Sequence, residues 1–176
     1  MLGEFIMIAI IYSVIWIIVA FKFADRNWKL YYPTMLFASL GNALYDLICY
    51  KYQLWQMEPN GLPVAMIPIL LLILIGMPLS TWVYLSKYPF RKGVRFQALY
   101  IAFFTVIYII LEYVSVKGGS ITYHHHWNLL WSLLFVIVMF TIMRIHFKKP
   151  LLALILSAIF AIFLCLVFDV TLDKMK

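Results

Sequence analysis

Residues 64–84 decide the fold, because they read VAMIPILLLILIGMPLSTWVY, an apolar run without a charged side chain. A transmembrane helix needs about 20 mostly apolar residues to cross about 30 Å of hydrocarbon, and this run is long enough. Five further segments qualify on the same grounds, at residues 4–21, 33–50, 96–116, 127–147 and 151–168. The sequence therefore predicts an all-α fold, a polytopic bundle of six transmembrane helices that forms a single transmembrane domain over residues 1–176.

The composition also indicates a membrane protein. Of the 176 residues, 66% are hydrophobic and 12% are charged, and the mean hydropathy is +0.98. An ordinary soluble domain is about 45–50% apolar and about 25% charged, so this class is excluded. Disorder needs low hydrophobicity, and a disulfide scaffold needs more than the two cysteines present, so both are excluded as well. Cys49 and Cys165 lie within apolar runs, and we interpret them as small buried hydrophobic residues.

The basic residues predict how the helices are oriented. The chain carries 14 Lys and Arg against 7 Asp and Glu, a formal net charge of +7. Ten of the 14 lie in or beside the first, third and fifth loops: Lys22, Arg26, Lys29, Lys87, Arg91, Lys92, Arg95, Arg144, Lys148 and Lys149. Cytoplasmic loops of membrane proteins carry an excess of Lys and Arg, so we expect these loops inside and both termini outside. The expected partners are membrane lipids and not nucleic acid, and the oligomeric state is left open.

Two carboxylates inside the predicted helices are the main candidates for a site. An ionisable group near the centre of a span costs about 2.5–3.5 kcal/mol, so each is a functional hypothesis that needs a partner. Asp46 and Glu112 each lie five residues before a flanking lysine, Lys51 and Lys117, on helices that run from inside to outside. At a rise of about 1.5 Å per residue, both carboxylates share a depth in the outer leaflet.

Polar side chains at helical spacing extend each carboxylate into a stripe, and the fourth loop adds a run of histidines before the fifth helix. If the polar faces turn inward, these groups converge on one outward-facing polar pocket. The candidate ligand-binding residues are Asn42, Tyr45, Asp46, Tyr108, Glu112, Ser115, His124, Asn128 and Trp131. Asp46 and Glu112 are also the candidates for catalysis, and whether the chain is an enzyme stays open.

Simpler interpretations compete with the pocket. Polar residues in a membrane also serve as interhelical hydrogen-bonding groups, worth about 0.6–2 kcal/mol per contact. Imidazole suits zinc, iron or manganese, so the consecutive His124, His125 and His126 are weak candidates for a metal site. Adjacent side chains on a helix point in different directions, so three histidines in a row rarely bind one metal ion. The alternative to a metal site is a histidine cluster at the membrane interface that responds to external pH. We expect no cofactor.

The leading functional hypothesis is a small integral membrane protein whose outward-facing pocket, with Asp46, Glu112 and the histidine cluster, binds a small ligand, an ion or a lipid headgroup. A second hypothesis is a membrane-embedded enzyme that acts on a lipid or isoprenoid substrate with Glu112 or a histidine as general base, which predicts a lateral groove that meets the carboxylates. A transporter predicts inverted repeats and a midplane site, which the sequence lacks. A structural or assembly protein predicts no pocket.

The order of short motifs along the chain resembles a family of small six-helix integral membrane proteins from spore-forming Gram-positive bacteria. The motifs that carry the resemblance are Asp25-Arg26-Asn27-Trp28-Lys29, Tyr31-Tyr32-Pro33-Thr34, Gly41-Asn42, Tyr45-Asp46, Leu54-Trp55, Lys87-Tyr88-Pro89, Glu112, Gly119-Ser120-Ile121-Thr122-Tyr123 and Trp127-Asn128. The resemblance covers most of the chain and implies a bacterial plasma membrane and six helices, but no activity. The triple histidine departs from the family pattern.

Overall fold

The protein is described by a computed structural model, which covers residues 7–171 and 173–175. This part of the chain holds six helical rods, a short 3-10 turn and two short strands. In chain order these are α1 (Ile8–Phe23), the 3-10 turn (Trp28–Leu30), α2 (Tyr32–Ile48), β1 (Trp55–Met57), the continuous rod of α3 (Met66–Leu71), a π-helical segment (Leu72–Gly76) and α4 (Met77–Ser86), then α5 (Val94–Lys117), β2 (Ile121–Tyr123), α6 (Leu129–Lys148) and α7 (Pro150–Val167).

The all-helical bundle that the sequence predicts is present. Helix ends lie within two residues of the expected ones, apart from the start of the first segment, since residues 4–6, including Glu4, lie outside the described residues. Four rods are long and apolar enough to cross a membrane: Met66–Ser86, Val94–Lys117, Leu129–Lys148 and Pro150–Val167. The helix α1 is apolar but shorter, with 16 residues, and α2 has 17.

The rod of 21 residues from Met66 to Ser86 changes its hydrogen-bonding pattern halfway along. Pro78 has no backbone N–H to donate to the carbonyl four residues earlier, so a regular α-helix cannot continue unchanged through this point. A π-helical segment, Leu72–Gly76, takes up the irregularity, and both halves keep a helical path. One rod therefore continues without a break from Met66 to Ser86.

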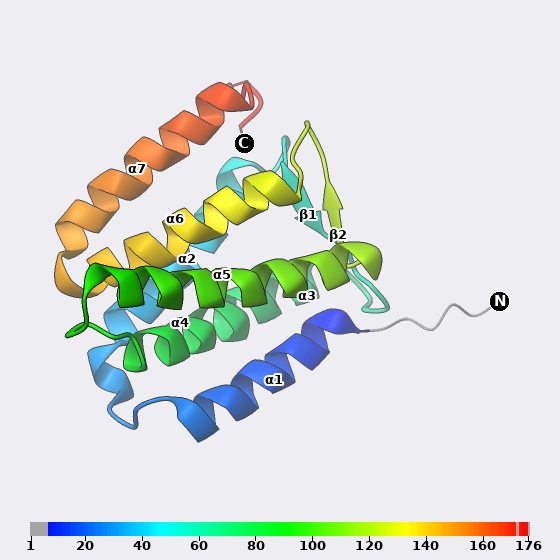
Figure 1. The fold of residues 1–176 in the computed structure, drawn as a ribbon. Helices are drawn as coiled ribbons and strands as arrows, with labels where there is room; N and C mark the ends of the chain where they lie inside the picture. The colour runs from blue at the N-terminus through cyan, green and yellow to red at the C-terminus, as the bar shows by residue number, and fades with distance from the viewer. Residues whose placement is uncertain (1–6, 172, 176) are drawn as a thin grey trace.

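Successive rods alternate in direction, which gathers the three basic loops at one end of the bundle (Figure 1). The ring of Phe147 at the end of α6 stacks on Tyr31 before α2 and on Phe90 after α4, with ring centroids 5.5 and 5.3 Å apart. The Lys148 ammonium lies 5.0 Å from the Phe90 ring centroid. We call the end of the bundle that carries these three loops the basic end.

The two strands lie at the opposite end, which we call the strand end (Figure 1). They pair antiparallel, with Trp55 opposite Tyr123, Gln56 opposite Thr122 and Met57 opposite Ile121. Sequence reasoning treated both segments as loops. Their backbone groups satisfy one another across the ladder, which ties the connection after α2 to the connection after α5.

The core of the bundle is aromatic. Tyr84 of α4 and Phe140 of α6 are fully buried, and the Tyr84 hydroxyl donates a 3.0 Å hydrogen bond to the Phe140 carbonyl oxygen. Phe104 of α5 packs edge-on against both rings. In contrast, large apolar side chains cover the outer faces, and Leu151 and Leu166 of α7 are 76% and 78% exposed. An apolar exterior of this extent suits a hydrocarbon solvent.

Candidate functional site

Glu112 of α5 fastens the segment that carries the histidine cluster. Its Oε1 accepts a 2.6 Å hydrogen bond from the Tyr123 hydroxyl of β2 and a second, short hydrogen bond from the Ser132 hydroxyl of α6. The Trp127 indole N–H donates to the same Ser132 oxygen at 2.8 Å. Tyr123 and Trp127 flank the histidines on either side, so Glu112 holds one end of their turn directly and the other end through Ser132. We call Glu112, Tyr123, Trp127 and Ser132 the Glu112 clamp.

Tyr45 of α2 plays a similar part for the other strand. Its hydroxyl donates to the Trp55 carbonyl oxygen at 2.8 Å and accepts from the backbone N–H groups of Leu54 and Trp55 at 2.9 and 2.8 Å. The rings of Tyr45 and Trp55 stack almost in parallel, with centroids 4.6 Å apart. Beside it, Asp46 accepts a 3.3 Å hydrogen bond from the Asn42 side-chain amide of the same helix.

Asp46 and Glu112 lie at the same end of the bundle, since their helices hold β1 and β2 respectively. Within the described residues they share no hydrogen-bond partner. Tyr108 points toward the core instead, where its hydroxyl pairs with Ser80 of α4. The Ser115 hydroxyl donates to a carbonyl oxygen of its own helix, that of Leu111. A single pocket formed by all of these groups stays a prediction.

The histidines form a tight turn. His125 and His126 both have left-handed backbone conformations, with φ of 50° and 64°, and the Trp127 N–H donates to the His124 carbonyl oxygen at 2.9 Å. These are the features of a type I′ turn, which Asn and Gly normally occupy. A histidine is less favourable there than Gly or Asn, and backbone strain of this kind often marks a functional segment.

A pocket of about 300 Å³ opens beside this turn at the strand end. It is lined by Tyr52, His125, His126, Trp131, Val167, Phe168 and Asp169. The His125 ring stacks on Tyr52 with a centroid separation of 3.5 Å, and Trp131 packs edge-on against Phe168 at 5.0 Å. We call this the strand-end pocket. Aromatic faces make up most of its wall, and Asp169 supplies a carboxylate.

A cation of the protein itself contacts two residues of the strand-end pocket, although it does not line the pocket. The Lys174 ammonium lies 4.6 Å from the Tyr52 ring centroid, and it donates to the Asp169 carboxylate and to the Asp169 carbonyl oxygen, at 2.7 Å each. The hydrogen bond to Asp169 raises the pKa of Lys174, so the amine stays charged. Desolvation, followed by the neighbouring charges of His124, Lys174 and His126, lowers the pKa of His125.

Asn128 and His124, two further candidates, make local contacts. Asn128 caps the N-terminus of α6, where its side-chain oxygen accepts from the backbone N–H groups of Leu130 and Trp131. His124 pairs with the Thr122 hydroxyl at 3.2 Å, and its ring centroid lies 6.4 Å from that of His125. No three His, Cys, Asp or Glu side chains gather closely enough to hold a metal ion in residues 7–171 and 173–175.

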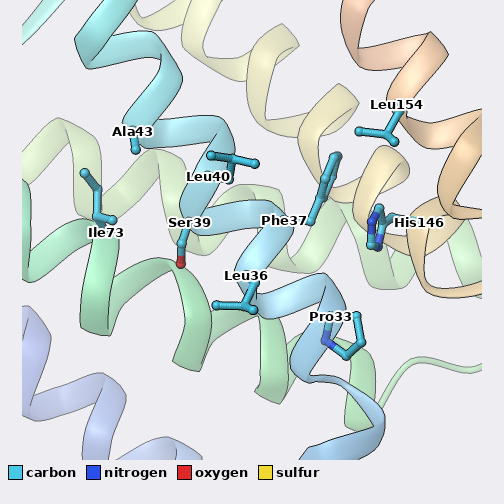
Figure 2. A pocket seen from close by; sticks show the side chains of 9 residues that line it. All are labelled: Pro33, Leu36, Phe37, Ser39, Leu40, Ala43, Ile73, His146 and Leu154. Carbon is cyan, nitrogen blue, oxygen red and sulfur yellow. The ribbon is translucent and has the colours of Figure 1, made fainter.

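A second cavity, of about 520 Å³, is an open groove on the side of the bundle. Figure 2 shows that α2 forms its floor, that Ile73 stands on one side, and that His146 and Leu154 stand on the other. Neither Asp46 nor Glu112 lines this groove or the strand-end pocket.

Sequence reasoning missed Tyr52, Phe168, Asp169 and Lys174, which lie in the second loop and in the C-terminal tail. Their only sequence signal is an aromatic residue or an isolated charge beside a predicted helix end, which is typical of interfacial anchors. The tail folds back so that Val170 and Phe168 pack with Leu54, a contact that no local pattern predicts.

No protein-family model, curated protein or solved structure matches the chain.

Proposed function

We propose that the chain is a six-helix integral membrane protein of a bacterial plasma membrane, with both termini and the strand end outside. In this proposal the strand-end pocket binds a small ligand or lipid headgroup that carries an ammonium group. The ten basic residues of the basic end would then lie in the cytoplasm, as the positive-inside rule requires. No reaction is part of the proposal.

The position of the Lys174 ammonium indicates that the ligand carries an ammonium group. A cation over an aromatic face is attracted by the ring quadrupole, and a carboxylate within hydrogen-bond distance adds charge neutralisation. The Tyr52 ring and the Asp169 carboxylate offer both features to one nitrogen. A free ammonium compound that displaces Lys174 would meet the same ring and the same carboxylate.

Glu112 and Tyr45, both half-buried, support this pocket without lining it. The Glu112 clamp holds the turn that places His125 against Tyr52, and Tyr45 holds β1, which follows Tyr52 in the chain. Glu112 and Tyr45 are therefore positioning residues in this proposal, and they do not touch the ligand.

Binding of choline and ethanolamine to the purified full chain tests the proposal. The protein is solubilised in a maltoside detergent, which has no ammonium headgroup to compete, and binding is measured by isothermal titration calorimetry. We expect the parent protein to bind, Tyr52→Leu to lose binding with its aromatic face, and Asp169→Asn to bind more weakly. Lys174→Met removes the internal competitor, so it should bind more tightly than the parent protein.

Tyr32→Leu is the matched control, since Tyr32 is an exposed tyrosine just before the second predicted span, at the basic end. It should bind as the parent protein does. Undiminished binding by Tyr52→Leu, or weaker binding by Lys174→Met, would contradict the proposed pocket. A parent protein that binds neither compound would favour a structural or assembly role.

A further inference from the structure

The open groove on α2 has the length of one membrane leaflet. Its floor runs along α2 from Pro33 to Ala43, ten residue steps at a rise of about 1.5 Å, which gives about 15 Å. The hydrocarbon core of a bilayer is about 30 Å thick, so a groove of this length accepts one acyl chain of one leaflet. The half-exposed side chains of Leu36 and Leu40 make the floor apolar.

The groove begins at the basic end. Pro33 lies in the first turn of α2, one turn after Lys29, and His146 lies one turn before Lys149. Both lysines are exposed, and neither pairs with an acidic side chain among the described residues. Basic side chains near a membrane surface attract anionic lipid by about 1 kcal/mol each. The mouth of the groove thus suits a negatively charged headgroup.

His146 supplies a hydrogen-bonding group inside the groove. Its Nδ1 pairs with the buried Thr34 hydroxyl at 2.9 Å, and its ring stacks on Phe37 with centroids 4.1 Å apart. Its other ring nitrogen, Nε2, has no hydrogen-bond partner in the part of the chain that the structure describes. When Thr34 donates to Nδ1, Nε2 carries the proton and can donate to a phosphate or ester oxygen.

We propose that this groove holds one acyl chain of an anionic phospholipid, with the phosphate near His146, Lys29 and Lys149. The alternative occupant is a helix from a second copy of the chain. Two copies in one membrane have the same orientation, so such a pairing sets the two basic ends side by side, and like charges oppose it. An anionic lipid instead neutralises the same charges. The inference is independent of the ligand of the strand-end pocket.

Lipid retention tests this site. The full chain is reconstituted in vesicles of equal phosphatidylglycerol and phosphatidylcholine, extracted in detergent, and examined by native mass spectrometry. We expect one phosphatidylglycerol to remain on the parent protein. Leu40→Trp fills the middle of the floor and should abolish retention, and since Leu40 is 55% exposed the added ring needs no room in the core.

Leu44→Trp is the matched control, because Leu44 lies one turn further along the same helix and does not line the groove. It should retain the lipid. The Lys29→Gln and Lys149→Gln pair should reduce the preference for phosphatidylglycerol over phosphatidylcholine, whereas Lys117→Gln at the strand end should not. Equal retention of the two lipids by the parent protein, or retention by Leu40→Trp, would overturn the inference. A lipid-free dimer that Leu40→Trp converts to a monomer would overturn it in favour of the second copy.

Discussion

Replacing Glu112 by glutamine tests whether its carboxylate holds the strand end together. The substitution keeps the shape of the side chain and removes its charge. In the parent protein one oxygen of Glu112 accepts from the hydroxyls of Tyr123 and Ser132. Two donors on one oxygen are the arrangement that an ionised carboxylate favours.

The loss of stability follows from the kind of hydrogen bond. A hydrogen bond to a charged group contributes about 1.5–3 kcal/mol and one between neutral groups about 0.5–1.5 kcal/mol, so two bonds lose about 2–3 kcal/mol between them. Interhelical hydrogen bonds measured in a membrane protein are weaker, about 0.6 kcal/mol on average, so two of them lower the expected loss to about 1 kcal/mol. For a chain of this size that corresponds to a fall in Tm of about 2–4 °C.

Thermal unfolding in detergent, followed by tryptophan fluorescence, measures this change. Tyr123→Phe removes one of the two bonds and should cost about half as much, and the double variant should cost less than the sum, because the two residues interact. Glu58→Gln is the control, since Glu58 accepts a single hydrogen bond from Thr122 in the same strand pair. A Glu112→Gln protein as stable as the parent would refute the charged clamp. If that variant also lost choline binding, Glu112 would be a ligand-binding residue and not a positioning one.

Three further predictions concern the histidine turn and the orientation. Because the pKa of His125 is lowered from its ordinary value of 6.5, its ring is neutral at neutral pH and gains a proton only at lower pH. This proton adds positive charge beside the bound ammonium, so choline binding should weaken as the pH falls below about 6.5, and His125→Gln should flatten the dependence. His126→Gly relieves a left-handed backbone at φ 64° and should raise the unfolding free energy by about 0.5–1 kcal/mol, as denaturant titration would show; a loss of stability would contradict the strained turn. In a variant without Cys49 and Cys165, a cysteine in place of Lys92 should resist a membrane-impermeant maleimide on intact cells, and one in place of His124 should react; the reverse pattern would invert the proposed orientation.

The sequence was sufficient for the helices because the physical requirement is local. An apolar run such as residues 64–84 satisfies all its backbone hydrogen bonds internally only as a helix, so length and hydropathy determine the element. The sequence also predicted that Asp46 and Glu112 lie at the same end of the bundle, because each lies five residues before a lysine that follows its helix. Their hydrogen-bond partners did not, because Tyr123 and Ser132 reach Glu112 only after α5 and α6 have packed.

The pairing of the two strands could not be predicted either, because it also depends on contacts between distant segments. Trp55–Met57 and Ile121–Tyr123 have three residues each, too few for a period-two pattern to stand out in a loop. Asn128 lies before an apolar helix, a position that fits a ligand site and an N-cap equally well. The structure shows the cap, and a part in ligand binding stays a prediction. Lys174 reaches Tyr52 only through the fold of the tail.

The strand ladder also bears on how the chain is made. Glu58 and Thr122, hydrogen-bonded across the two strands, are 64 residues apart, and both α4 and α5 are synthesised between them. Until the ribosome has delivered the second strand, the first exposes an open hydrogen-bonding edge on the nascent protein. Its closure is thus a late event in biogenesis, and a truncated chain that is released from the ribosome and ends before Ile121 should be degraded faster than one that extends beyond Ser132.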